Sequence, residues 1–402
     1  MTEAATAAGA DARRNVIILA TSQALCMSGA SLIMTISALA GQMLATDKTL
    51  ATVPLALQFT ATMLTTIPAS LLMGRVGRRI GFTLGQIIGI CGASVACYAL
   101  FQADFVMFAV GSMLLGVHNA FWQYYRFAAA DVAGPDFKAR AISYVMAGGV
   151  AAAILGPQIS KWTIDLFEPV TFAGGYAGVM GLSFLTIILL QLVRIPKPAR
   201  RRFAAGGRPL LEIARQPAFI LAVMTAMFGY GVMTLVMTAT PLAMTLCGFG
   251  FSSTATVIQW HVLAMFAPSF FTGDLIKRFG VINVILAGVV LNICAMAVNL
   301  TGINIANFTG GLILLGLGWN LMFIGGTTLV TETYRTEEQS KVQALNDFLV
   351  FSTVSAASFS SGALQAKLGW EAVNMTLAVP MFAVFVGAVW YKMGHPRSGA
   401  AA

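Results

Sequence analysis

The sequence predicts an all-α membrane protein in which twelve transmembrane helices form two six-helix bundles. Of its 402 residues, 58% are apolar and 10% are charged, whereas soluble domains carry about 25% charged residues. Apolar stretches of about 20 residues, long enough to cross a hydrocarbon core of about 30 Å, recur along the chain. The basic residues, in addition, are divided unevenly between alternate loops.

Twelve apolar stretches define the predicted spans. The first bundle, residues 16–194, contains the spans 16–45, 51–73, 79–101, 105–130, 141–163 and 173–194. The second bundle, residues 218–393, contains the spans 218–246, 253–275, 281–300, 305–331, 342–365 and 372–393. A tail of residues 1–15, a basic linker of residues 195–217 and a tail of residues 394–402 complete the chain.

The distribution of basic residues predicts the orientation in the membrane. When alternate loops are assigned to opposite sides, 20 of the 24 Lys and Arg residues fall on one side. An excess of Lys and Arg marks the cytoplasmic side, so both termini and the linker are predicted to be cytoplasmic. The N-terminus has no cleavable signal pattern, so the first span itself is expected to direct insertion into the membrane. The net charge of +9 is therefore a topology signal and does not indicate a nucleic-acid partner.

The two predicted bundles repeat each other at an offset of 200 residues. Gly111 and Gly116 correspond to Gly311 and Gly316, and two prolines share the same offset. The linker between the bundles, RIPKPARRRFAAGGRPL, is rich in Pro, Gly and Arg, which favours an exposed segment over a helix. Two repeated halves of this kind are expected of a secondary transporter.

A short basic turn follows each of these prolines. The turns SLLMGRVGRRIG and SFFTGDLIKRFG resemble the major facilitator signature G-x-L-x-D-R-x-G-R-R, except that Gly74 and Lys277 stand where the acidic residue is expected. Acidic residues at the cytoplasmic ends of other helices are candidates to replace it. The predicted gate or coupling residues are Arg75, Arg78, Asp131, Asp274, Arg278, Glu332 and Asp347.

Two pairs of metal-ligand residues have helical spacing. Met233 and Met237 are four residues apart in the seventh span, and His261 and Met265 are four apart in the eighth. One Met pair at this spacing is expected by chance among 21 Met, but a His–Met pair is expected only about 0.16 times. Thioether sulfur and imidazole suit copper, and all four residues fall near mid-membrane depth.

Two more soft donors extend the stripe of Met233 and Met237 towards the outside. Met244 and Cys247 lie within about 40° of Met233 at 100° per residue. They are predicted to receive a metal ion at the outer mouth.

The motifs Met233-x-x-x-Met237 and His261-x-x-x-Met265 resemble those of the CcoA-type copper importers of the major facilitator superfamily. The resemblance implies a multi-pass protein of the bacterial inner membrane that transports copper into the cell, and it implies that these four residues handle the copper. It also implies delivery of copper to maturation factors of a cbb-type cytochrome oxidase. No cofactor is expected; copper is the transported substrate, and the membrane lipids are the other expected partner.

A polar and aromatic run in the fourth span favours a rival hypothesis. This run would suit a planar organic substrate, and riboflavin carriers exist in the same broad group of transporters. The candidate cavity residues are His118, Asn119, Trp122, Gln123, Tyr125, Arg126, Tyr230, Trp319 and Asn320.

Three other functions fit the sequence less well. Drug efflux is disfavoured, because Gln158 follows Gly156 and Pro157 where drug antiporters have glycine, and Ser112 stands at the place of their helix 4 arginine. A membrane copper sensor or assembly factor that does not transport is disfavoured by the repeated halves. An enzyme is not expected, because the spans contain no nucleophile with a base, phosphate loop or carboxylate pair.

Overall fold

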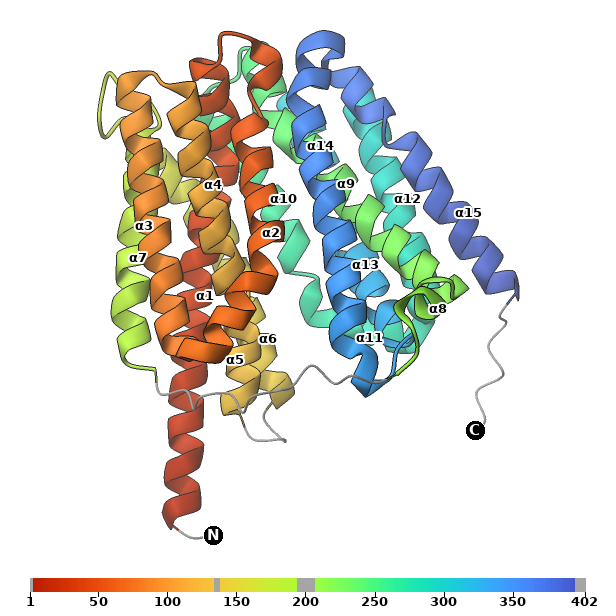
Figure 1. The fold of residues 1–402 in the computed structure, drawn as a ribbon. Coiled ribbons are helices and arrows are strands. Elements are labelled where there is room, and N and C mark those ends of the chain that lie inside the picture. Colours follow the sequence, from red (N-terminus) through yellow and green to blue (C-terminus); the bar gives the residue numbers. More distant parts are fainter. Residues whose placement is uncertain (1–2, 134–137, 194–206, 395–402) are drawn as a thin grey trace. The chain divides into compact units, whose positions relative to one another are not determined.

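The computed structural model describes residues 3–133, 138–193 and 207–394, and these residues form helices joined by turns, with no strand among them (Figure 1). The predicted tail from residue 395 onward and residues 195–206 of the predicted linker lie outside the described residues. The all-α prediction is therefore confirmed.

The helices divide into two compact units. The N-terminal unit consists of residues 1–202 and 249–263, and the C-terminal unit consists of residues 203–248 and 264–402. Residues 249–263 were predicted to belong to the second bundle. They group with the N-terminal unit because Gln158 donates to Gln259 and Lys161 donates to Thr256.

The N-terminal unit contains the first six predicted spans. Its helices are α1 (Glu3–Leu44), α2 (Val53–Val76), α3 (Arg78–Gln102), α4 (Phe105–Trp122), α5 (Tyr125–Val132), α6 (Lys138–Thr163) and α7 (Ala173–Gln191). Helix α1 packs along α6, and α3 packs along α4 and α7. Two boundaries differ from the prediction, because α1 already begins within the predicted tail and the predicted fourth span is divided into α4 and α5.

The C-terminal unit contains the last six predicted spans, except residues 253–263 of the eighth. Its helices are α8 (Leu210–Ala214), α9 (Pro217–Leu246), the end of α10 (Phe251–Phe266), α11 (Ser269–Phe279), α12 (Val281–Leu300), α13 (Ile305–Thr331), α14 (Gln339–Met375) and α15 (Ala378–Gly394). Helix α9, green in Figure 1, lies beside α13 and α14. Helix α8 shows that part of the predicted exposed linker is helical instead.

Within the described ranges, nine stretches are long and apolar enough to cross a membrane. The difference from twelve has three sources. Helices α14 and α15 count as one stretch, although Gly369, with φ of 78°, interrupts α14 between the eleventh and twelfth predicted spans. Helices α10 and α11, with 16 and 11 residues, are each too short to cross a membrane alone, and α6 is not among the nine stretches.

The repeated glycines lie where helices cross closely. A Cβ on Gly111 of α4 would lie 2.6 Å from the backbone nitrogen of Ala96 in α3, and one on Gly311 of α13 would lie 1.8 Å from the Asn299 side chain in α12. Small residues let membrane helices approach in this way. The sequence repeat is thus a repeated helix crossing, α3 with α4 and α12 with α13.

Candidate functional site

The eighth predicted span is broken between α10 and α11. The break falls at Pro268, which cannot donate a backbone hydrogen bond and whose ring clashes with the preceding turn. The equivalent Pro68 lies inside α2, which remains a single helix. A proline at the same place in the repeat therefore lies within a continuous helix in the first half and at a helix break in the second half.

Asn320 of α13 holds this break. Its side-chain amide donates to the backbone oxygen of Met265 and to the Ser269 hydroxyl, both at 2.7 Å, and its carbonyl oxygen accepts from the Thr272 hydroxyl at 2.6 Å. Asn320 was predicted to line a cavity, but these bonds occupy its amide. They satisfy polar groups that a membrane offers no water to satisfy.

The N-terminal repeat lacks these polar side chains. Ala69, Leu72 and Ala120 stand at the positions of Ser269, Thr272 and Asn320. Apolar side chains cannot satisfy the backbone groups of a broken helix, whereas an amide and two hydroxyls can. This difference accounts for a break in one half only.

Five aromatic rings gather beside the broken helix in the C-terminal unit. The Trp319 ring stacks on Phe323 with centroids 5.0 Å apart and planes at 8°. Tyr230 of α9 meets Trp319 at 5.4 Å and Phe323 at 5.5 Å. Phe266 meets Trp319 at 5.9 Å, and Phe351 of α14 meets Tyr230 at 6.2 Å. We call these five residues the aromatic cluster.

The aromatic cluster has free surface and unused hydrogen-bonding capacity. Trp319 is buried, but the other four rings are only half-buried. The Trp319 indole N–H is buried and has no hydrogen-bond partner among the described residues. Unsatisfied buried polar groups are rare and require an explanation. A planar aromatic ligand with hydrogen-bond acceptors would meet both needs.

A polar stripe on α9 continues from the aromatic cluster. Thr234 and Thr238 follow Tyr230 by one and two helical turns, so the three side chains share a face. In the described part of the chain, both Thr hydroxyls are buried without a hydrogen-bond partner. These hydroxyls add sites for a ligand that also carries hydroxyl groups.

The predicted copper ligands are divided between the two units. Met233, Met237 and Met265 belong to the C-terminal unit and His261 to the N-terminal unit, and all four are buried. Nowhere in the described ranges do three or more His, Cys, Asp or Glu residues gather in a group able to hold a metal. A copper site would therefore depend on Met thioethers, and it stays a prediction.

The predicted metal entry residues lie at the end of α9. Met244 is fully buried and Cys247 is the half-buried residue that ends the helix. Their role also stays a prediction.

The polar run of the fourth span is largely packed into the N-terminal unit. Tyr125 is fully buried, meets Phe82 edge to face at 4.5 Å and accepts a hydrogen bond from Gln86. Trp122 donates to the Asn119 side chain at 3.0 Å. These contacts place Tyr125 in the protein core and not on a substrate cavity.

The end of that run marks the division between α4 and α5. Gln123 caps α4, and the Arg126 guanidinium lies 4.8 Å from the centre of the Phe127 ring. His118 is treated below, because a different set of contacts surrounds it.

The predicted gate residues have different environments. Arg78 forms an ion pair with Asp131, which was one of the acidic residues expected to replace the missing acid of the signature. Asp274 lies 4.0 Å from Lys277, with both side chains exposed. Arg75 and Glu332 are exposed.

The remaining two predicted gate residues have local contacts. Arg278 stacks on the neighbouring Phe279 ring at 5.3 Å, and Asp347 accepts a hydrogen bond from the adjacent Asn346. A gating role for the seven residues stays a prediction.

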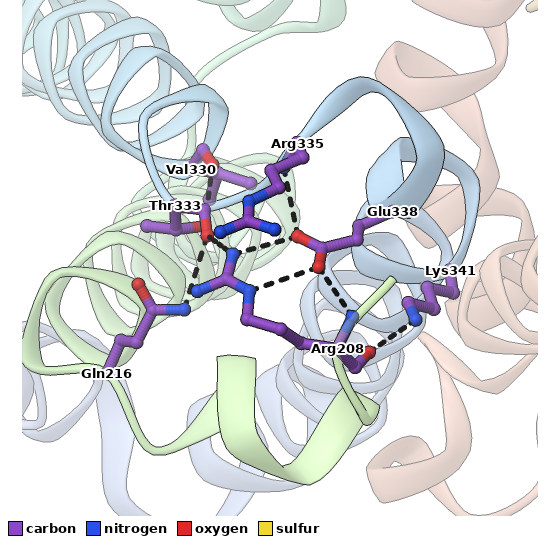
Figure 2. A network of polar contacts seen from close by, with 7 residues as sticks. All are labelled: Arg208, Gln216, Val330, Thr333, Arg335, Glu338 and Lys341. Carbon is purple, nitrogen blue, oxygen red and sulfur yellow. Dashed lines mark hydrogen bonds and ion pairs between the residues drawn. The ribbon is translucent and has the colours of Figure 1, made fainter. Parts of the chain in front are cut away.

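A buried carboxylate that the sequence analysis missed lies in the loop between α13 and α14. Figure 2 shows Glu338 facing Arg208, which lies two residues before α8. The Arg208 guanidinium donates to both carboxylate oxygens, at 3.0 and 2.8 Å, and the Arg208 backbone N–H donates at 2.7 Å. Only the acidic pair Glu337 and Glu338, which precedes the predicted span 342–365, could have drawn attention to it.

Neighbouring groups complete this network. The Arg208 guanidinium and the Gln216 amide both donate to the backbone oxygen of Thr333, and the Arg335 N–H donates to Glu338. Lys341 donates to the backbone oxygen of Arg208 (Figure 2). The end of the linker is thereby attached to the loop between α13 and α14.

Comparison with known proteins identifies relatives over nearly the whole chain. The chain is 42% identical to the riboflavin transporter RfnT of Brucella anthropi over 392 residues, which cover 97% of this chain and 98% of the relative. It is 27% identical to the uncharacterized MFS-type transporter YdeG of Bacillus subtilis, covering 94% and 92% of the two chains. The copper part of the predicted resemblance gains no support from these relatives.

The fold is that of known transporters. The crystal structure of an auto-inhibited POT family peptide transporter superposes with a TM-score of 0.69 at 13% identity, covering 96% of this chain and 98% of the other. The model of the Major Facilitator Superfamily matches residues 19–359. Together with the apolar helices, this match makes the chain a multi-pass protein of the bacterial inner membrane. The chain therefore belongs to the Major Facilitator Superfamily.

Proposed function

We propose that this protein carries riboflavin, or a solute of the same planar aromatic class, across the inner membrane. The aromatic cluster is the observation that carries the proposal. Riboflavin joins a planar ring system, which stacks on aromatic side chains, to a chain of hydroxyl groups. The stacked pair Trp319 and Phe323 offers the first kind of contact, and the hydroxyls of Thr234 and Thr238 offer the second.

Two further arguments support an organic solute over copper. A relative that is 42% identical over nearly its whole length is named a riboflavin transporter. The buried indole N–H of Trp319 provides a hydrogen-bond donor, which suits the carbonyl and nitrogen acceptors of a flavin ring but cannot bind a metal ion.

The test is uptake of radioactive riboflavin by cells that express this chain, compared with cells that carry an empty vector. Saturable uptake is expected. Trp319→Leu removes the stacking face, worth about 0.5–1.5 kcal/mol, and should raise KM about two- to twelvefold. Trp370→Leu is the matched control, because Trp370 is another buried Trp of the C-terminal unit and lies outside the aromatic cluster.

Copper uptake measured in the same cells decides between the two hypotheses. An alanine variant of Met233, Met237, His261 and Met265 should not lower copper accumulation if the proposal is correct. Saturable copper uptake that this variant loses, together with no riboflavin uptake, would contradict the proposal.

A further inference from the structure

His118 is a titratable residue buried inside the N-terminal unit. It lies on α4, thirteen residues after Phe105, and its side chain is only 5% exposed. Ionisable side chains inside a membrane span are costly and commonly mark ion or proton pathways. The contacts of His118 therefore indicate what the residue does.

One nitrogen of the imidazole is committed to α3. Nδ1 lies 3.0 Å from the backbone oxygen of Gly85. A carbonyl oxygen only accepts hydrogen bonds, so Nδ1 carries the proton of the neutral ring and Nε2 carries the lone pair. Gly89 leaves room for the imidazole ring, because a Cβ at this position would lie only 2.7 Å from Nδ1.

His118 lines a small enclosed space between α1, α4 and α7. Its volume is about 10 Å³, and Cys26, Asn119 and Ser183 also line it. This is room for about one water molecule. A riboflavin molecule cannot enter it, but a proton carried by water can.

His118 is the side chain in this space that can accept a proton at neutral pH. Among the described residues, no acidic or basic side chain other than His118 lines it. The nearby titratable groups are the Cys26 thiol of α1 and the Tyr125 phenol of α5, which are joined through the Gln86 amide. At neutral pH the Cys26 thiol and the Tyr125 phenol are both uncharged. A protonated His118 ring would therefore not be repelled by a positive charge on either group. In α2 the titratable residue is Arg75, which lies at the end of the helix.

We propose that His118 is the proton-binding residue that couples solute movement to the proton gradient. In each cycle the Nε2 lone pair takes one proton from the outer side and releases it on the inner side. No covalent bond to carbon changes and no electron is transferred, so one positive charge crosses with each solute molecule. This inference rests on the proposed riboflavin transport.

The experiment uses the full-length protein in liposomes, with the membrane potential clamped to zero. With one proton per solute molecule, an inward gradient of one pH unit drives about a tenfold accumulation of riboflavin. Exchange of internal for external riboflavin without a gradient needs no net proton movement. The wild type, His118→Gln and the control Ser112→Ala are compared in both assays, because Ser112 is a buried polar residue of the same helix that does not line this space.

The expected result is that His118→Gln exchanges riboflavin at near the wild-type rate but no longer accumulates it, whereas Ser112→Ala does both. Accumulation by His118→Gln equal to the wild type would overturn the proposal. So would exchange without gradient-driven accumulation in the wild type, and both results would leave riboflavin transport intact. Loss of exchange in both His118→Gln and His118→Asn at normal abundance would also overturn it, in favour of a structural role. Absence of exchange in the wild type would instead contradict the proposed function, and the inference with it.

Discussion

Glu338 and Arg208 are 130 residues apart in the chain, yet Arg208 donates three hydrogen bonds to the Glu338 carboxylate from its guanidinium and its own backbone N–H. The Glu338 side chain has no exposed surface. Close packing also surrounds this pair, because a Cβ on Gly207 would lie 2.5 Å from Glu338 Cγ. The pair attaches the linker to the loop before α14.

Removing the charge of Glu338 should destabilise the C-terminal unit. In Glu338→Gln the Arg208 guanidinium keeps its charge but loses its bidentate partner, and charge-assisted hydrogen bonds are roughly twice as strong as neutral ones. A lower midpoint of thermal unfolding in detergent is expected. Glu337→Gln is the control, because Glu337 is the exposed neighbour. Equal midpoints for the two variants would show that the network contributes nothing.

The same pair predicts a pH dependence of stability. The Arg208 guanidinium, with the backbone N–H groups of Arg335 and Arg208, holds the pKa of Glu338 well below its usual range. A carboxylate with a lowered pKa in the folded state stabilises the protein fully above the unfolded pKa of about 4.3 and loses that contribution as the pH falls below it. The stability difference between wild type and Glu338→Gln should therefore be constant near neutral pH and shrink in acid. Unfolding midpoints measured across this range check the sign.

Asn320 should be required at the helix break. Asn320→Ala removes three hydrogen bonds that hold Met265, Ser269 and Thr272. Hydrogen bonds between membrane helices average about 0.6 kcal/mol each, so a loss of about 1–3 kcal/mol is expected. The change should also raise the KM for riboflavin, because Phe266 and Trp319 lie beside the break.

Asn283→Ala is the control for Asn320, since its amide bonds lie at an exposed position. Urea unfolding in micelles and uptake kinetics are the two measurements. Unchanged stability and kinetics in Asn320→Ala would mean that Pro268 alone maintains the break.

Two glycines of the N-terminal unit should respond differently to the same substitution. A Cβ on Gly116 would lie 2.1 Å from the backbone oxygen of Gln58, so Gly116→Ala must separate α2 from α4. Overpacking of this kind costs about 1–3 kcal/mol. No atom lies within 4 Å of a Cβ on Gly181 in α7, where alanine should stabilise the helix by about 0.5–1 kcal/mol. The measurement is the unfolding midpoint of each variant. A shift in the same direction for both variants would contradict the close contact predicted between α2 and α4 at Gly116.

Much of the fold is readable from the sequence, because local composition decides it. Membrane spans must satisfy their own backbone hydrogen bonds, so long apolar stretches specify helices wherever they occur. The offset of 200 between Gly111 and Gly311 likewise indicates that the two halves are equivalent, and each of these glycines lies at a close helix crossing.

The candidate site was only partly readable. Tyr230 and Trp319 were predicted to line a cavity, but Phe266, Phe323 and Phe351 were not, because single aromatic residues are ordinary in apolar helices. The Met and His spacing predicts a copper site, which stays a prediction, because a sequence reveals which residues share a helix face but not which helices face each other.

The sequence by itself determined the class of protein: an apolar, helical, two-halved transporter whose segments must lie in lipid. Only the tertiary structure decided that five rings from four helices meet at one place, that Asn320 holds a broken helix, and that Glu338 pairs with Arg208. The physical reason is the separation along the chain of the residues that interact. Helix formation depends on neighbours within one or two turns, whereas the aromatic cluster and the pair Glu338–Arg208 depend on contacts between residues far apart in the chain.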